Sequence, residues 1–127
     1  MTALAVAVGG ALGALARYGL GTWVRSMSGW AFPVGTMTVN LLGCLLLGLT
    51  VSWMDAVSLS QTARRFAVIG VLGAFTTFST YTLETMILIE QRFWIRAAFY
   101  ALGSLGLGVL AMMAGMGLGA MITQAKG

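Results

Sequence analysis

Residues 70–82 read Gly-Val-Leu-Gly-Ala-Phe-Thr-Thr-Phe-Ser-Thr-Tyr-Thr, which sets glycines and a dense run of hydroxyl side chains inside an apolar segment, residues 66–89. A segment of this length and apolarity predicts a helix that crosses a bilayer, which takes about 20 apolar residues. Irregular backbone at such a depth is tolerated only where it is buried in protein or lines a watery cavity. The stretch therefore predicts a spanning helix that is broken near residues 73–79. The alternative is an unbroken helix whose Ser and Thr side chains bond back to their own backbone.

Further apolar segments lie on either side of this one, at residues 3–24, 32–53 and 93–122. The chain of 127 residues is 59% hydrophobic and 8% charged, whereas a soluble domain is about 45–50% apolar and about 25% charged. We expect a single domain over residues 1–127, an all-α membrane protein of four transmembrane helices. Residues 1–8 contain no Lys or Arg, so the first segment is expected to remain as a helix rather than be a cleaved signal.

Short connections separate the segments. The connection at residues 90–92 is so short that the helices on either side of it must be antiparallel neighbours. Tryptophan rings suit the headgroup layer at helix ends, and the tryptophans near predicted ends are Trp23, Trp30, Trp53 and Trp94. Small residues spaced by four predict close helix packing. These pairs are Gly9 with Gly13, Gly70 with Ala74, and Gly115 with Gly119.

Basic residues are balanced between the two ends of the predicted bundle. Arg25, Arg92 and Arg96 lie at one end, and Arg64, Arg65 and Lys126 lie at the other. This balance gives no positive-inside preference, so the chain is expected to insert in both orientations and to pair as an antiparallel homodimer. The net charge of +4 is scattered rather than gathered in a stripe, which favours contact with lipid headgroups over nucleic acid.

Small polar residues recur at helical spacing on two segments. The second segment carries Thr36, Asn40 and Gly43, and the fourth carries Tyr100, Ser104 and Gly108. Two such stripes facing each other would form a polar track. Asn40 can donate two hydrogen bonds to an anion, or it can join neighbouring helices.

Aromatic and ionisable residues inside the segments are further candidates. Phe75, Phe78 and Tyr81 recur every three residues, and the positive edge of an aromatic ring can meet an anion without trapping it; the alternative is packing in the core. Arg17 and Glu84 are ionisable groups within spanning segments, which are functional candidates by default. Arg17 could instead extend to the interface. Glu84 could line a vestibule, cap the broken helix or pair with an Arg.

Motifs on the first three segments occur in a fixed order. They are Gly-Gly-Ala-Leu-Gly-Ala-Leu-Ala-Arg-Tyr at residues 9–18, Gly-Thr-Met-Thr-Val-Asn-Leu-Leu-Gly at residues 35–43, and Gly-Ala-Phe-Thr-Thr-Phe-Ser-Thr-Tyr at residues 73–81, followed by Glu84. Together with the layout of the segments, they resemble the CrcB or Fluc family of small fluoride channels over the full chain.

This resemblance implies a passive, selective channel that exports fluoride from the cytoplasm across the bacterial inner membrane. It implies an antiparallel, dual-topology homodimer with two pores and a structural sodium ion at the dimer interface, held by the main-chain carbonyls of Gly73 and Thr76, and no organic cofactor. The partners would be a second copy, fluoride and membrane lipid, and no nucleic acid. The implied fluoride pathway contains Asn40, Phe78, Tyr81, Thr36, Tyr100 and Ser104, with Thr77, Ser79 and Thr80 as further hydroxyls and Arg17 and Glu84 as vestibule or structural charges.

The chain departs from the family pattern at several positions. Tyr81 stands where a second pore phenylalanine is usual, Gly108 where a serine is common, and Ala74 where a glycine is usual. Tyr81 keeps a ring edge but adds a hydroxyl that could bind the ion or water. Phe75 is expected to pack, because the family pattern requires no aromatic there.

Other functions remain as alternatives. A small multidrug exporter would require a carboxylate in the first segment, where this chain has Arg17. A non-transporting assembly subunit would leave the hydroxyl cluster unexplained. An enzyme is least expected, because the chain has no His and its acids are distant in sequence. Cys44, the single cysteine, is expected to be a small packing residue and cannot form an internal disulfide or a His/Cys metal cluster.

Overall fold

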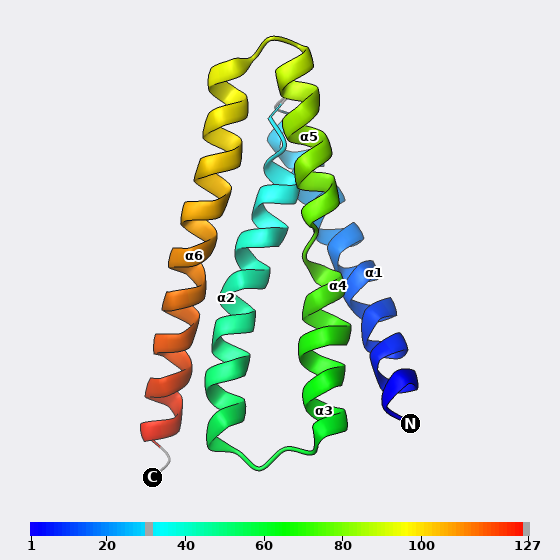
Figure 1. Ribbon diagram of the computed structural model, residues 1–127, viewed down its shortest axis with the longest axis vertical. Helices are drawn as coiled ribbons and strands as arrows, with labels where there is room; N and C mark the ends of the chain where they lie inside the picture. Colours follow the sequence, from blue (N-terminus) through cyan, green and yellow to red (C-terminus); the bar gives the residue numbers. More distant parts are fainter. Residues whose placement is uncertain (30–31, 126–127) are drawn as a thin grey trace.

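The computed structural model describes residues 1–29 and 32–125 as a bundle of long helices (Figure 1). Its elements are α1 (Thr2–Ser28), α2 (Val34–Ala56), α3 (Gln61–Arg65), the π-helix η1 (Phe66–Leu72), α4 (Gly73–Phe75), α5 (Phe78–Glu90) and α6 (Trp94–Gln124). Within that part of the chain, four helical stretches are long and apolar enough to cross a membrane: α1, α2, the span Gln61–Glu90 and α6. The predicted all-α fold with four candidate transmembrane helices is confirmed. Trp30 and Lys126, which entered the sequence argument, lie outside the described residues.

Each of the four spans extends beyond its expected range at one end or both, and the largest extensions are in α1 and the third span. α1 continues to Ser28, and the third span begins at Gln61. Ser60 starts this span by accepting a hydrogen bond from the Ala63 N–H at 3.2 Å, as an N-cap does. The charge of Arg25 suggests an earlier end for the first span and that of Arg64 a later start for the third, but a charged side chain at a helix terminus can reach water without ending the helix.

The spans alternate in direction along the bundle. In Figure 1 the start of α1 and the end of α6 lie at the same end as the turn between α2 and α3. α2 and α6 therefore run in the same direction, and they pack side by side. α5 and α6 are antiparallel neighbours, as the short connection predicted. Their turn is sharp because Arg92 adopts a left-handed conformation (φ 61°) and its N–H bonds the Ile89 carbonyl at 2.9 Å.

Glycines bring helix backbones into contact along two seams. Between α1 and η1, a Cβ atom placed on Gly9 would lie 2.7 Å from the Phe66 carbonyl oxygen, and one on Gly70 would lie 3.0 Å from the Gly9 Cα. Between α2 and α6, a Cβ atom on Gly119 would lie 2.8 Å from the Leu49 carbonyl oxygen. Larger side chains would push these helices apart, so the prediction of close packing at small residues is confirmed.

The third span is interrupted between α4 and α5. Thr76 and Thr77 are extended, with ψ 159° at Thr76 and φ −147° at Thr77, and α5 begins at Phe78. The Thr77 hydroxyl accepts a hydrogen bond from the Thr80 N–H at 3.3 Å and so caps α5. The predicted break near residues 73–79 is confirmed. The π-helical turn of η1 just before it was not predicted, although such turns are frequent at functional sites.

Large apolar side chains cover much of the outside of the bundle. Examples are Leu15, Ile95, Phe99, Leu102 and Met121. Such a surface suits lipid or another copy of the chain. Trp23, Trp53 and Trp94 lie near the ends of their helices, as predicted.

Candidate functional site

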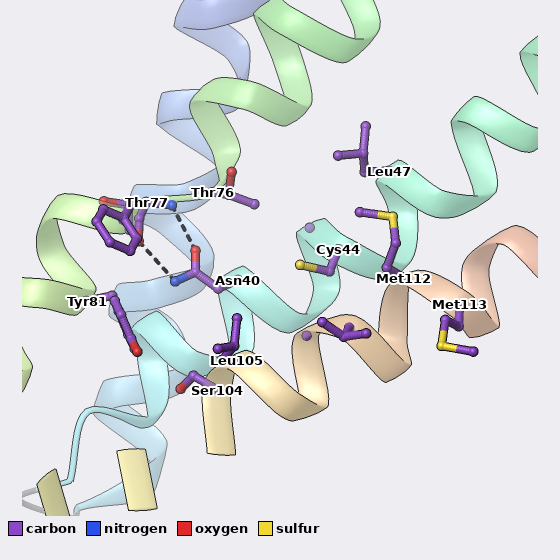
Figure 2. A pocket seen from close by; sticks show the side chains of 14 residues that line it. Asn40, Cys44, Leu47, Thr76, Thr77, Tyr81, Ser104, Leu105, Met112 and Met113 are labelled. Atoms are coloured by element: carbon purple, nitrogen blue, oxygen red, sulfur yellow. Dashed lines mark hydrogen bonds between the residues drawn. The ribbon is translucent and has the colours of Figure 1, made fainter. Parts of the chain in front are cut away.

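Asn40 of α2 bonds the backbone of the break (Figure 2). Its Nδ2 donates to the Thr77 carbonyl at 3.0 Å, and its Oδ1 accepts from the Thr77 N–H at 2.8 Å. These bonds pair both backbone groups of an extended residue inside an apolar bundle, where each unpaired group would cost about 1–3 kcal/mol. Asn40 thus joins α2 to the break, one of the roles expected for it. An amide nitrogen carries a second hydrogen, which has no acceptor among residues 1–29 and 32–125.

A pocket of about 510 Å³, called the break pocket below, opens beside Asn40 between α2, the break and α6. Its polar lining comprises Asn40, Thr76, Thr77, Tyr81 and Ser104, and its far end is apolar (Figure 2). Among the residues that the structure describes, no charged side chain lines it. An ion in this pocket would therefore meet dipoles and ring edges rather than a countercharge.

Aromatic rings form one wall of the break pocket. The centroids of Phe78 and Tyr81, which both line it, lie 5.7 Å apart, and those of Tyr81 and Tyr100 lie 5.4 Å apart. The Tyr81 hydroxyl donates to the Ala101 carbonyl at 2.8 Å, so the bundle itself occupies this hydroxyl. Phe78 is 79% exposed, and much of its ring faces away from this chain. Phe75 is buried, as the packing alternative requires.

The Ser104 hydroxyl of α6 is an unpaired polar group in the break pocket. Its Oγ is buried and has no hydrogen-bond partner in the described part of the chain. Native structures pair nearly all buried hydroxyls, because an unpaired one costs about 1–3 kcal/mol. Ser104 and Asn40 line the same pocket. The hydroxyl therefore has a hydrogen to donate that no group in the described part of the chain accepts.

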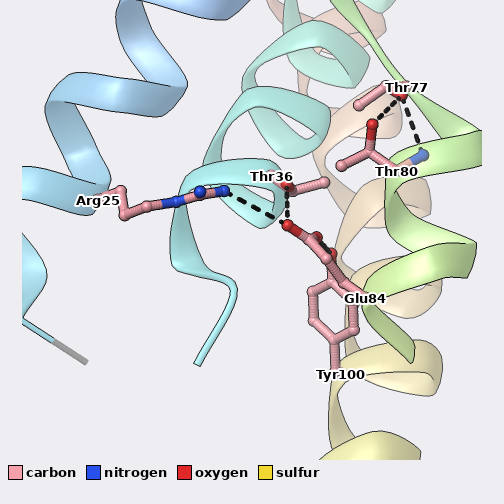
Figure 3. Close-up of polar contacts among 6 residues, drawn as sticks. All are labelled: Arg25, Thr36, Thr77, Thr80, Glu84 and Tyr100. Carbon is pink, nitrogen blue, oxygen red and sulfur yellow. Dashed lines mark hydrogen bonds and ion pairs between the residues drawn. The ribbon is translucent and has the colours of Figure 1, made fainter. Parts of the chain in front are cut away.

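Glu84 of α5 receives donors from α1, α2 and α6 (Figure 3). Its Oε1 accepts from the Thr36 hydroxyl at 2.9 Å and lies 3.6 Å from an Arg25 nitrogen. Its Oε2 accepts from the Tyr100 hydroxyl at 2.7 Å. The Arg25 side chain is 69% exposed, so this ion pair contributes at most about 1 kcal/mol. The cluster directs the hydroxyls of Thr36 and Tyr100 to the carboxylate rather than into the break pocket. Of the three roles left open for Glu84, pairing with an Arg is the one seen here.

A second pocket of about 210 Å³, called the arginine pocket below, lies between α1, α2 and the break. Arg17 and Arg25, which lie on one side of α1 two turns apart, both line it. Arg17 does not extend to the interface, because its Nε donates to the Ala74 carbonyl at 3.1 Å. The hydroxyl-bearing residues of its lining are Tyr18, Thr22, Thr36, Thr77 and Thr80.

The structure brings the predicted site residues together in three groups. The break pocket is lined by Asn40, Thr77, Phe78, Tyr81 and Ser104. The arginine pocket is lined by Arg17, Thr36, Thr77 and Thr80. The carboxylate cluster contains Glu84 and Tyr100. Thr77 lines both pockets, so the break is their common wall. Ser79 and Gly73 are exposed and line neither. Sequence reasoning missed Arg25, although its spacing from Arg17 placed it on the same face of the helix.

The break frees the main-chain carbonyls of Gly73 and Thr76. In a continuous helix they would accept from the N–H groups of Thr77 and Thr80. Those N–H groups donate instead to the Asn40 Oδ1 and the Thr77 Oγ1. Carbonyls of unwound helices are ligands that sodium takes, so the residues expected to hold a sodium ion fit that ion. Across residues 1–29 and 32–125, His, Cys, Asp and Glu side chains form no group of three or more that could hold a metal.

Comparison with known proteins identifies relatives over most of the chain. The family model described as "CrcB-like protein, Camphor Resistance (CrcB)" matches residues 4–116. A fluoride-specific ion channel FluC of Thermus thermophilus is 49% identical over 116 residues, which cover 91% of each chain. A protein of the same name from Chloroflexus aurantiacus is 44% identical over 91% of this chain and 93% of its own. Another, from a Roseiflexus species, is 42% identical over 93% of this chain and 96% of its own.

Proposed function

We propose that this chain, which belongs to the CrcB-like family, is a passive and selective fluoride channel. The relatives that carry the name fluoride-specific ion channel match it over nearly their whole length. Its spanning helices make it a multi-pass membrane protein, of a family of channels rather than enzymes. We place it in the bacterial inner membrane, where a passive channel lets fluoride that has accumulated in the cytoplasm flow out.

The observation that carries this proposal is the unpaired Ser104 hydroxyl in a pocket without charged side chains among the described residues. Fluoride is small and strongly hydrated, so a pathway must replace lost water with short donors. The Ser104 O–H and the second Asn40 N–H supply donors, and the edges of the Phe78 and Tyr81 rings add weak positive potential. Because no cation holds the ion, it can also leave.

The arginine pocket suits the mouth of this pathway. Two guanidinium groups there raise the local concentration of anions. Arg17 is bound to Ala74 and Arg25 is paired with Glu84, so neither presents a fully free cation that would trap the ion. Thr77 lines both this mouth and the break pocket, and its hydroxyl bonds the Thr80 hydroxyl of the arginine pocket at 2.9 Å. Fluoride would pass from the arginines, along these hydroxyls, to Ser104.

A second copy of the chain completes the proposed channel. The Phe78 side chain is 79% exposed in the single chain, whereas a ring that lines an ion pathway should be shielded by protein. We propose that an antiparallel partner supplies this shielding. Such a homodimer would hold two pathways. The freed carbonyls of Gly73 and Thr76 from both copies would hold a structural sodium ion at the interface, whose charge would stabilise the carbonyl end of α4.

The direct test is anion efflux from liposomes that contain the purified protein. Rapid release of fluoride, read with a fluoride electrode, and no release of chloride is expected. Release of both anions would overturn the proposed selectivity, and release of neither from folded protein would overturn the channel itself.

Asn40→Asp is the variant that tests the site. Asp keeps the acceptor for the Thr77 N–H but loses the N–H donors and adds a negative charge. Fluoride efflux is expected to fall at least about 100-fold, equivalent to about 2.7 kcal/mol of added barrier. Gel filtration controls for folding. Near-normal efflux from the folded variant would remove Asn40 from the pathway.

A further inference from the structure

Cys44 and Gly108 face each other in the break pocket, one helical turn beyond Asn40 and Ser104. Because α2 and α6 run in the same direction, a step of four residues on each helix keeps the two pairs level. A Cβ atom placed on Gly108 would lie 3.5 Å from the Cys44 Sγ, which is ordinary van der Waals contact. The glycine thus leaves the space in front of the thiol open.

The surroundings of Cys44 point to a ligand. The thiol is free and partly buried, and it is directed to the pocket side of α2 (Figure 2). One turn away, the Ser104 Oγ is buried without a partner among the residues described. If Cys44 served only for packing, the missing hydrogen-bond partner of Ser104 would stay unexplained, because the thiol and the hydroxyl do not bond each other. A ligand that moves along the pocket would meet both in succession.

We propose that the Cys44 thiol is part of the fluoride pathway and supplies the donor that follows Ser104, at the level where α6 carries Gly108 instead of a polar side chain. This inference rests on the proposed channel function and adds a residue to its path. An S–H group is a weaker donor than an O–H group, so it passes the anion on without retaining it. Since Cys44 is the single cysteine, the pathway becomes a selective target for small thiol reagents.

The test is fluoride efflux before and after treatment with methyl methanethiosulfonate. The Cys44 thiolate, after losing its proton to water, attacks the sulfenyl sulfur; a methyl disulfide forms on Cys44 and methanesulfinate leaves. The added group fills the space in front of Gly108, so efflux is expected to slow at least about tenfold, as a barrier increase of about 1.4 kcal/mol would produce. Dithiothreitol should restore it, and mass spectrometry reports the extent of modification.

Two variants serve as controls. Cys44→Ser keeps a donor and should conduct fluoride at a rate that the reagent leaves unchanged. Cys44→Ser with Leu110→Cys places a thiol on the exposed side of α6, where modification should leave efflux unchanged. If wild-type protein conducts fluoride and full modification of Cys44 does not slow it, or if Cys44 cannot be modified, this inference fails while the channel stands. If the untreated wild-type protein does not conduct fluoride, the proposed function fails instead.

Discussion

Hydroxyl groups that lie close together in this bundle have different roles. The Tyr81 hydroxyl donates to the Ala101 carbonyl, and the Thr36 hydroxyl donates to Glu84. The Ser104 hydroxyl, by contrast, is buried without a partner within the described ranges. Bonded hydroxyls contribute to folding, whereas an unpaired one costs stability. The position of a hydroxyl on a polar stripe therefore does not show whether it is bonded and stabilises the fold or is left unpaired.

Ser104→Ala should separate stability from conduction. Removing an unpaired buried hydroxyl leaves the free energy of unfolding unchanged or raises it by up to about 1 kcal/mol. Thr36→Ala, which removes a bond to the Glu84 carboxylate, should instead lower it by about 1–3 kcal/mol. Thermal unfolding in detergent measures both changes, and liposome efflux should show slower fluoride release for Ser104→Ala. A clear loss of stability in Ser104→Ala would mean that its hydroxyl is bonded within the folded protein.

At the scale of helices, the seams decide how closely the spans approach. α2 and α6 meet through Gly48, Gly115 and Gly119, and this contact sets the width of the break pocket between them. Lipid offers no hydrophobic drive for association, so backbone approach at glycines provides much of the packing. The break is likewise an element shared between helices, because Asn40 of α2 supplies the bonds that the third span loses.

Gly115→Ala and Gly117→Ala form a matched pair for this seam. A Cβ atom on Gly115 would lie 2.9 Å from the Leu49 backbone nitrogen, whereas one on Gly117 would meet nothing within 4 Å. Both substitutions gain about 1 kcal/mol of helix propensity. Gly115→Ala is nevertheless expected to lower stability by about 1–3 kcal/mol through overpacking, and Gly117→Ala to raise it slightly. Equal melting temperatures for the two variants would contradict the close approach of α2 and α6.

At the scale of the whole molecule, basic side chains lie at both ends of the bundle. Arg25, Arg92 and Arg96 lie toward one end, and Arg64 and Arg65 lie in α3 toward the other. Arg64 is held there by Asp55 at 3.4 Å and by the Met54 carbonyl. Orientation in the membrane follows such charges, and this distribution supports the proposed insertion in both directions.

Adding basic residues at one end of the bundle should abolish fluoride efflux, because all copies would then insert in the same orientation. Ser58→Lys with Gln61→Lys adds two charges at exposed positions of the α3 end, and reporters fused to the C-terminus should then appear on one side of the membrane only. An antiparallel dimer cannot form from one orientation, so fluoride efflux is expected to be lost. Coexpression with a variant biased the opposite way should restore it. Full efflux from the biased variant alone would contradict an antiparallel channel.

Much of the architecture was predictable from local properties of the chain. The apolar segments, their number and the turn between α5 and α6 follow from hydrophobic length and loop length, which need no partner. The break between α4 and α5 was predictable because glycine and clustered hydroxyls weaken a helix wherever it packs. The ends of the helices were less predictable. α1 continues past Arg25, and the third span begins directly after Ser60, so both helices are longer than the positions of the charges suggest.

Sequence by itself determined the membrane class, the spans, the break and which polar residues are available to a site. Only the tertiary structure decided how those residues are used: it turned Thr36 and Tyr100 toward Glu84 and left Ser104 unpaired. It also brought Arg25 beside Arg17 in one pocket and set Cys44 opposite Gly108. The physical reason is that helix periodicity fixes the face on which a side chain lies, whereas its bonding partner depends on which backbone lies opposite, and the glycine seams determine that.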